Sequence, residues 1–170
     1  MQHQQTVIIT GGNSGLGLAC AKALLANSPD LQVVIAARDA GRARAAVEAL
    51  RQAAPQNGAN VEAMMLDLAS LASVRAFAEE LDRRLAAGSL PPVKGLVCNA
   101  GFQGARGLTA DGYERTFGVN HLGHYLLVNL VLPLLAPSAR IAIVASGVHD
   151  RAQLATLPSA LAATMPGPAW

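Results

Sequence analysis

The sequence predicts an α/β fold with a doubly wound parallel sheet. Short apolar runs alternate along the chain with segments whose apolar residues recur at helical spacing. The runs are almost uniformly apolar, which is typical of parallel strands covered by helices on both faces. Of the 170 residues, 52% are hydrophobic and 14% are charged. These values indicate one globular domain that buries a core without disulfides or metal.

Three strand–helix units occupy the first half of the chain. We predict strands at residues 6–10, 31–36 and 61–66, each followed by a helix. Asp39 precedes the second helix and Ser70 the third, and both residue types accept hydrogen bonds from the free N–H groups of a first turn. The third helix has a continuous apolar stripe, formed by Leu71, Val74, Phe77, Ala78, Leu81 and Leu85.

The second half supplies two more strands. Residues 93–98 predict the fourth strand, residues 111 to about 135 a long helix, and residues 141–145 the fifth strand. The alternation then stops, so we expect a domain at residues 1–146 and an irregular tail at residues 147–170. The sheet is expected to be truncated after its fifth strand.

The segment between the first strand and the first helix, residues 10–17, reads Thr-Gly-Gly-Asn-Ser-Gly-Leu-Gly. Glycine permits a tight turn and lets the backbone approach a pyrophosphate, and the helix N-terminus supplies unpaired N–H groups. A purely structural turn is the alternative, but the position between strand and helix favours a dinucleotide site in a Rossmann-like domain. The candidate residues are Thr10, Gly11, Asn13, Ser14, Gly15, Leu16 and Gly17.

The end of the second strand bears on the choice between NAD and NADP. An NAD site usually has an acidic residue here, which binds the 2′-hydroxyl of the ribose. This strand ends with Arg38, whose guanidinium can form a charge-assisted fork to a 2′-phosphate, and Arg42 lies about one helical turn further on. The sequence therefore favours NADP (NADPH). The alternative is a solvated Arg38 beside an Asp39 that only caps a helix.

Composition excludes several other classes of function. The net charge is only +2 and the arginines are scattered, so we expect no nucleic-acid partner. The longest apolar stretch, residues 125–136, is interrupted by Asn129 and Pro133 and is too short to span a bilayer. Cys20 and Cys98 lack the spacing of a metal site, which predicts no bound metal. The amino-terminus has no export signal, so we expect a cytoplasmic protein.

Taken together, these motifs resemble the short-chain dehydrogenase/reductase family. The family pattern has the turn at residues 10–17, an acidic residue after the third strand (Asp67) and Asn-Ala-Gly after the fourth (residues 99–101). Asn120 and Ser146 stand where the family keeps its catalytic Asn and Ser. Residues 111–127 are similar to the branch of retinol-dehydrogenase-like, WW-domain-oxidoreductase-like and protochlorophyllide-reductase-like enzymes, which is mostly NADP-dependent.

The resemblance implies a role for each matching residue. Asp67 would accept a hydrogen bond from the adenine amino group beside the Leu68 amide, and Ser146 would bind the substrate oxygen. The backbone at Asn120 would hold a water molecule of a proton relay. The alternatives are that Asp67 and Ser70 only cap a helix start and that Asn120 is a buried amide satisfied by backbone. The residues expected along the ribose are Asn99, Ala100 and Gly101, and those expected to be structural are His121, His124 and His149.

One part of the family pattern is missing. The family uses a Tyr with a Lys four residues later for proton transfer, and nothing after Ser146 is Tyr or Lys. Tyr113 and Tyr125 lie on the earlier helix without such a Lys. We therefore expect the cofactor-binding part of a longer NADP-dependent oxidoreductase of small carbonyl, alcohol or activated alkene substrates, with little activity of its own. The alternative is an inactive NADP-binding module that senses the cofactor or pairs with a complete relative.

The helix at residues 111–135 also predicts an assembly. Its end is apolar on all sides, with more apolar surface than one sheet face can cover. In the family this helix packs against its counterpart in a partner subunit. The fifth strand would present an open edge, and both features predict self-association.

Overall fold

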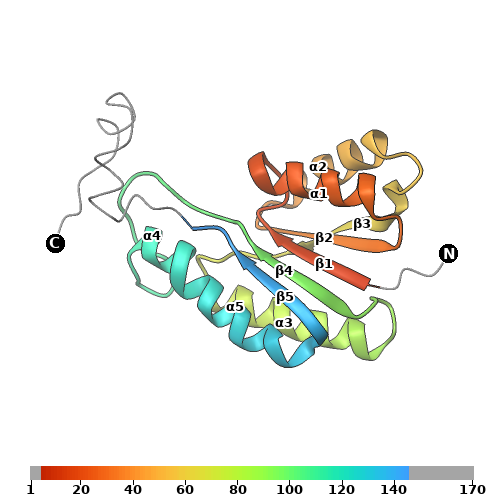
Figure 1. The fold of residues 1–170 in the computed structure, drawn as a ribbon. Coiled ribbons are helices and arrows are strands. Elements are labelled where there is room, and N and C mark those ends of the chain that lie inside the picture. The colour runs from red at the N-terminus through yellow and green to blue at the C-terminus, as the bar shows by residue number, and fades with distance from the viewer. Residues whose placement is uncertain (1–4, 146–170) are drawn as a thin grey trace, which may run out of the picture.

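The computed structural model describes residues 5–145, which form a five-stranded parallel sheet (Figure 1). The strand order is β3-β2-β1-β4-β5, so the chain continues from β1 to one side of the sheet and later returns to the other. This reversal beside β1 leaves a crevice at the carboxyl ends of β1 and β4. The predicted α/β, Rossmann-like fold is confirmed. The strands are β1 Gln5–Thr10, β2 Leu31–Ala37, β3 Val61–Met65, β4 Val93–Cys98 and β5 Leu135–Ile143.

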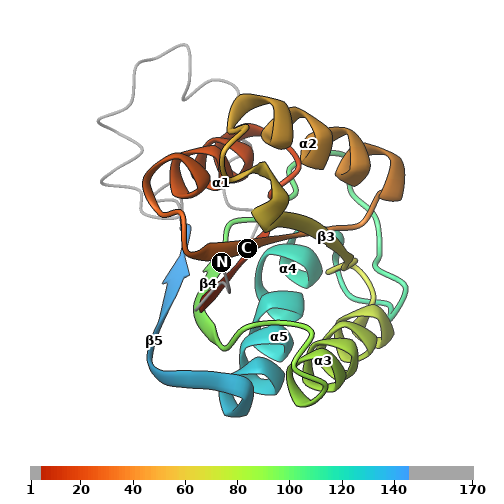
Figure 2. The same ribbon diagram turned by 90° about the vertical axis from the view of Figure 1, so that its right-hand side faces the viewer.

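The helices form a layer on each face of the sheet (Figures 1 and 2). The helices α1 Gly15–Asn27 and α2 Ala40–Ala53 cover one face, and α3 Leu71–Ala86 and α5 Gly123–Val131 cover the other. Neighbouring residues of one strand point to opposite faces, so Ile8 enters the core under α3 and α5 while Ile9 enters the core under α1 and α2. Both side chains are completely buried.

The two predicted helix caps are present. The Asp39 side chain accepts a hydrogen bond from the Arg42 backbone N–H at 2.9 Å, and Ser70 Oγ accepts one from Ser73 at 3.3 Å. These local bonds fix the starts of α2 and α3, at the same edge of the sheet as the glycine turn.

The helix expected at residues 111–135 begins later than the sequence pattern indicated. It starts with α4 Arg115–Phe117, continues through a π-helical turn at Gly118–Leu122 into α5, and ends with a 3₁₀ turn at Leu132–Leu134. Asp111 lies outside the helix because its carboxylate accepts a hydrogen bond from Leu71 N–H of α3 at 2.8 Å. Glu114 takes over as the cap, accepting hydrogen bonds from two backbone N–H groups of α4.

The fifth strand also differs from the expectation of residues 141–145. It begins at Leu135 and contains an irregularity, since Val93 pairs with Leu135 but Gly95 pairs with Arg140. Residues 136–139 form this irregularity, and Ser138 among them has a positive φ of 62°. β5 is an edge strand and is largely exposed, with Ile143 70% accessible, so helices do not cover both of its faces. Ser146 and the expected tail at residues 147–170 lie outside the described residues.

Candidate functional site

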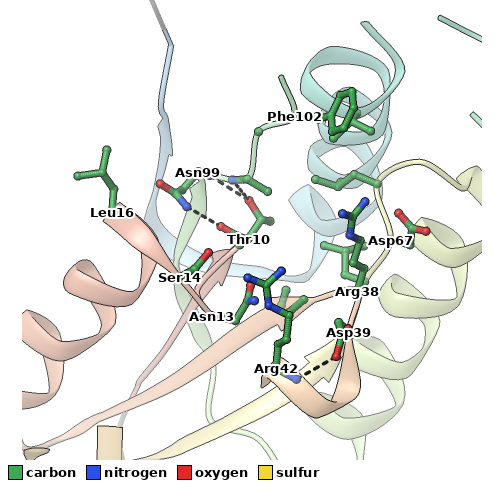
Figure 3. Close-up of a pocket in the computed structure, with 18 residues that line it drawn as sticks. Thr10, Asn13, Ser14, Leu16, Arg38, Asp39, Arg42, Asp67, Asn99 and Phe102 are labelled. Atoms are coloured by element: carbon green, nitrogen blue, oxygen red, sulfur yellow. Dashed lines mark hydrogen bonds between the residues drawn. The ribbon is translucent and has the colours of Figure 1, made fainter. Parts of the chain in front are cut away.

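A cavity of about 400 Å³ opens at the carboxyl edge of the sheet, where β1, β2, β3 and β4 end (Figure 3). Its size falls within the usual range for small-molecule sites. Most of the residues named from the sequence as nucleotide-binding line it: Thr10, Gly11, Asn13, Ser14, Leu16, Arg38, Asp67, Leu68, Asn99, Ala100 and Gly101. Gly15, Gly17 and Asn120 are not among the lining residues, and Ser146 lies outside the described part of the chain.

Glycine is required at different positions of the turn for different structural reasons. Gly11 and Gly15 have positive φ angles of 66° and 52°, which residues with a Cβ rarely adopt. A Cβ on Gly17 would lie 2.5 Å from the Gly11 carbonyl oxygen and 2.6 Å from Asn99 Nδ2. Gly17 therefore lets α1 approach the turn and the end of β4, although it does not face the cavity itself.

The N-terminus of α1 is open toward the cavity. Its N-cap residue, Ser14, makes no capping hydrogen bond, and the first turn contains no acidic residue. In contrast, Asp39 caps α2 and Ser70 caps α3. Free N–H groups and the positive end of a helix dipole form a ready anion site. Of these three helices, only α1 leaves its first turn without a side-chain cap.

Thr10 and Asn99 join the two central strands below the cavity. Thr10 Oγ1 accepts hydrogen bonds from the Asn99 and Ala100 backbone N–H groups, each at 2.9 Å. Asn99 Nδ2 in turn donates to the Thr10 carbonyl at 3.0 Å. The pair therefore fixes the Asn-Ala-Gly segment against the end of β1, at the point where the strand order reverses.

Positive charge gathers at the end of β2. The side chains of Arg38 and Arg42 both extend toward the cavity, with Asp39 between them in the sequence (Figure 3). The Arg42 backbone N–H donates to Asp39 and holds the pKa of that carboxyl below its usual range. Asp39 thus stays ionised, so the end of β2 contributes two guanidinium groups and one carboxylate to the lining of the cavity.

Asp67 forms hydrogen bonds with its own segment of the chain and also lines the cavity. Its Oδ1 accepts a hydrogen bond from the Ala69 N–H at 2.9 Å, while its own N–H donates to Ser73 Oγ. The first turn of α3 is capped by Ser70, so of the two residues named as alternative caps only Ser70 caps α3 itself. Asp67 and Leu68 both still line the cavity.

Asn120 makes two hydrogen bonds with one backbone unit. Its Oδ1 accepts from Phe102 N–H at 2.7 Å and its Nδ2 donates to Phe102 carbonyl oxygen at 2.9 Å. These backbone partners are those of the alternative considered above, but Asn120 is exposed and not the buried amide that the alternative assumed. The Asn120 side chain fastens the loop after β4 to the π-helical turn.

Sequence reasoning missed several residues that line or support the cavity, and two of them, Phe102 and Gly12, have clear structural roles. Phe102 lines the cavity and carries the Arg115 guanidinium over its ring, 5.6 Å from the centroid. Its position directly after Asn-Ala-Gly was the available signal. Gly12 was not singled out, yet a Cβ there would lie 2.6 Å from Ile35 Cγ2, so the turn packs directly on β2.

The histidines differ in environment. His124 is 8% exposed, and burial lowers its pKa from the ordinary 6.5. Its ring nitrogens lie 3.0 Å from Thr10 Oγ1 and 3.4 Å from the Asn120 carbonyl oxygen. His121 is exposed and stacks on Phe117 and Tyr125. His149 lies outside the described residues.

Two negative findings apply to residues 5–145 alone. No group of three or more His, Cys, Asp or Glu side chains in this part of the chain could hold a metal ion. No helix within it has the length and apolar character needed to cross a membrane.

Comparisons with known proteins agree with this geometry. The family model for short chain dehydrogenases matches residues 5–157. Mouse retinol dehydrogenase 14 is 42% identical over 165 residues, which is 91% of this chain and 47% of that protein. Rice protochlorophyllide reductase A is 45% identical over 85% of this chain and 37% of its own length. The human WW domain-containing oxidoreductase is 41% identical over 85% and 34%.

Solved structures show the same likeness. An uncharacterised protein from Mycobacterium paratuberculosis superposes with a TM-score of 0.70 at 38% identity, over 86% of this chain and 47% of that chain. The NADPH-bound short chain oxidoreductase of Pseudomonas aeruginosa with an atypical catalytic center has a TM-score of 0.64 at 33% identity, over 86% and 55%. The chain spans about half or less of the length of the curated relatives named above. It belongs to the short-chain dehydrogenase family, in the branch of retinol dehydrogenase 14, protochlorophyllide reductase and the WW domain-containing oxidoreductase.

Proposed function

We propose that this chain binds NADP(H) and is the cofactor-binding part of an oxidoreductase. The observation that carries the proposal is the combination of an uncapped α1 N-terminus with two arginines on the same cavity. An uncapped helix start suits a pyrophosphate, and a second cluster of positive charge suits a further phosphate. NADP has this extra phosphate on its adenosine ribose, and NAD does not.

The residues present fit this cofactor. The backbone at residues 11–17 would hold the pyrophosphate, since Gly17 keeps α1 close to the turn and no side chain fills the space at Gly15. Arg38 and Arg42 would bind the 2′-phosphate. Asp67 and Leu68 would face the adenine, and the backbone at residues 99–101 would line the ribose.

When bound, NADPH supplies a hydride for a carbonyl or activated alkene of a small-molecule substrate, and NADP accepts one from an alcohol. Within the described part of the chain, Asn120 orients the loop after β4 beside the region where substrate would enter. The sequence has Tyr only at 113 and 125 and Lys only at 22 and 94, without the four-residue Tyr–Lys spacing. We therefore propose little turnover by the 170-residue chain, because loss of a general acid typically removes a factor of about 10²–10⁴.

A second candidate is a module that binds NADP without catalysis. It is favoured by the same absence of a spaced Tyr–Lys pair from the sequence, together with an intact cavity. The two candidates share the nucleotide site and differ in chemistry. Slow oxidation of NADPH that depends on an added aldehyde or ketone supports the enzyme, and tight binding with no oxidation for any carbonyl tested supports the module.

Calorimetric titration with NADPH and NADH tests the cofactor assignment. We expect NADPH to bind at least tenfold more tightly, a difference of about 1.4 kcal/mol. The Arg38→Leu variant should lose most of this preference while its affinity for NADH stays nearly the same, because NADH has no 2′-phosphate. Arg44→Leu is the matched control, since it removes one charge from an exposed position of α2 outside the cavity lining. Equal losses for both cofactors in Arg38→Leu would refute the assignment.

A further inference from the structure

The buried hydroxyl of Thr10 has four polar neighbours. The N–H groups of Asn99 and Ala100 donate to its oxygen at 2.9 Å each. His124 Nε2 lies at 3.0 Å and the Val97 carbonyl oxygen at 3.4 Å. A hydroxyl has two acceptor lone pairs and one proton to donate. Two N–H groups therefore fill its acceptor capacity, and its own proton is left for one of the two other neighbours.

Distance assigns that proton to the histidine. At 3.0 Å, His124 Nε2 is within ordinary hydrogen-bond range of the hydroxyl, whereas 3.4 Å to the Val97 oxygen is long. Nε2 must then be an acceptor, so in a neutral ring the proton is on Nδ1. Nδ1–H then faces the Asn120 carbonyl oxygen, although 3.4 Å is as long for this contact as it is for the one to Val97.

The surroundings of His124 favour a neutral ring. The side chain is 8% exposed, and burial lowers its pKa while the bond to the Asn120 carbonyl opposes that shift. No carboxylate among residues 5–145 forms an ion pair with it, since the ion pairs found there are Arg83–Glu80 and Arg84–Glu62. A buried imidazolium without a counter-ion is costly.

We propose that His124, as its Nδ1–H tautomer, is a positioning residue of the nucleotide site. It accepts the Thr10 proton and so turns both lone pairs of the hydroxyl toward the N–H groups of Asn99 and Ala100. Its Nδ1 lies 3.4 Å from the carbonyl oxygen of Asn120, whose side chain holds Phe102 at the cavity. A proton on Nε2 would be a third donor on one oxygen and would compete with the Asn99–Ala100 segment. The part of this role that concerns the nucleotide rests on the proposed NADP function.

The first test needs no nucleotide. Imidazole ¹⁵N shifts of the wild-type protein at about pH 7 report which ring nitrogen carries the proton. The His124 ring signals are assigned in the wild-type protein itself, through their connection to the backbone signals of the same residue. We expect a neutral Nδ1–H ring, and an Nε2–H ring or an imidazolium would overturn the proposal. Because this measurement uses wild-type protein, it stands even where a variant fails to fold.

The second test compares three His124 variants that differ in whether the new side chain has an acceptor that can reach the Thr10 hydroxyl. The side-chain oxygen of His124→Gln can still accept from Thr10, whereas His124→Asn is shorter and His124→Leu has no acceptor. We expect Gln to retain slow hydrogen exchange at the Asn99 and Ala100 amides and NADPH affinity within about threefold of wild type. Asn and Leu should speed exchange at both amides and weaken NADPH binding about tenfold, the effect of losing one buried hydrogen bond. His121→Leu, an exposed position one turn earlier on the same helical segment, is the matched control and should change neither quantity.

The outcomes separate the two proposals. If wild type fails to bind NADPH while the tautomer and the exchange pattern are as expected, the proposed function is wrong and the positioning of Asn99 and Ala100 stands. If wild type binds NADPH and Leu matches it in both exchange and affinity, His124 positions nothing and the inference is refuted. A uniform loss of melting temperature in Gln, Asn and Leu, with unchanged exchange and affinity, would mean a purely structural histidine.

Discussion

A matched pair of glycine substitutions tests how the turn is built. Gly17→Ala places a Cβ 2.5 Å from the Gly11 carbonyl oxygen, where van der Waals contact needs about 3.5 Å. The first turn of α1 must therefore withdraw by about 1 Å. Gly15→Ala adds the same methyl group two residues earlier, where nothing lies within 4 Å, and only the φ of 52° opposes it.

The two costs can be worked from these contacts. Overpacking of a rigid site costs about 1–3 kcal/mol, and Gly17 lies near the upper end because the opposing atoms are backbone. An alanine in the left-handed region costs about 1 kcal/mol at Gly15. For a chain of this size 1 kcal/mol corresponds to about 2–4 °C in Tm. We expect Tm to fall by about 5–10 °C in Gly17→Ala and by about 2–4 °C in Gly15→Ala.

Thermal melts with and without NADPH measure both effects. A shift of about 1 Å in the turn also displaces the N–H groups that face the cavity, so NADPH affinity should fall at least tenfold in Gly17→Ala. Gly15→Ala keeps the position of α1 and should bind more tightly than Gly17→Ala. A Gly15→Ala protein that is the less stable of the two would refute the close approach of α1 to Gly11 and Asn99.

Three further predictions concern the cysteines and the assembly. Burial raises the pKa of Cys98 to about 11. Iodoacetamide at about pH 8 should therefore alkylate the partly exposed Cys20 first. Equal labelling of both thiols in the folded protein would contradict the burial of Cys98. Because the Cys98 pKa is raised in the folded state, its contribution to stability is full below the ordinary pKa of 9.0 and is lost as pH rises toward 11, which urea unfolding at increasing pH would measure. We also expect self-association through the exposed face of α5, so Tyr125→Glu, at a side chain 63% exposed, should shift sedimentation toward monomer. Met65→Glu, at a side chain 50% exposed on β3, is the control, and identical sedimentation of wild type and Tyr125→Glu would count against this interface.

The features that the sequence predicted correctly depend on local chemistry. The Asp39 and Ser70 side chains each accept a hydrogen bond from a backbone N–H group three residues later. The glycine turn is likewise specified by adjacent residues. The apolar runs of β1 and β2 are largely buried as their composition indicated, whereas β3, at the other edge of the sheet, leaves Met65 50% exposed. Local patterns of this kind are visible without knowledge of the fold.

The features that were wrong or missed depend on residues far apart in the sequence. Asp111 was expected in a helix because its partner, Leu71, lies in a different element. The start of β5 was missed because Leu135 pairs with Val93 but pairing resumes only at Arg140, so residues 136–139 interrupt the strand and leave no continuous apolar pattern. The bond between His124 and Thr10 joins positions 114 residues apart, so no spacing rule indicates it.

The bond from Leu71 to Asp111 has a consequence for the order of folding. α3 receives one cap from Ser70, which is available as soon as its first turn forms, and a second from a residue forty positions later. The second cap requires β4 to have joined the sheet and the loop after it to have returned to the start of α3. Closing such a loop costs entropy that is repaid only when the later contacts form. α3 can therefore nucleate early on a ribosome-bound chain, while its N-terminus reaches its final stability only after residue 111 has emerged.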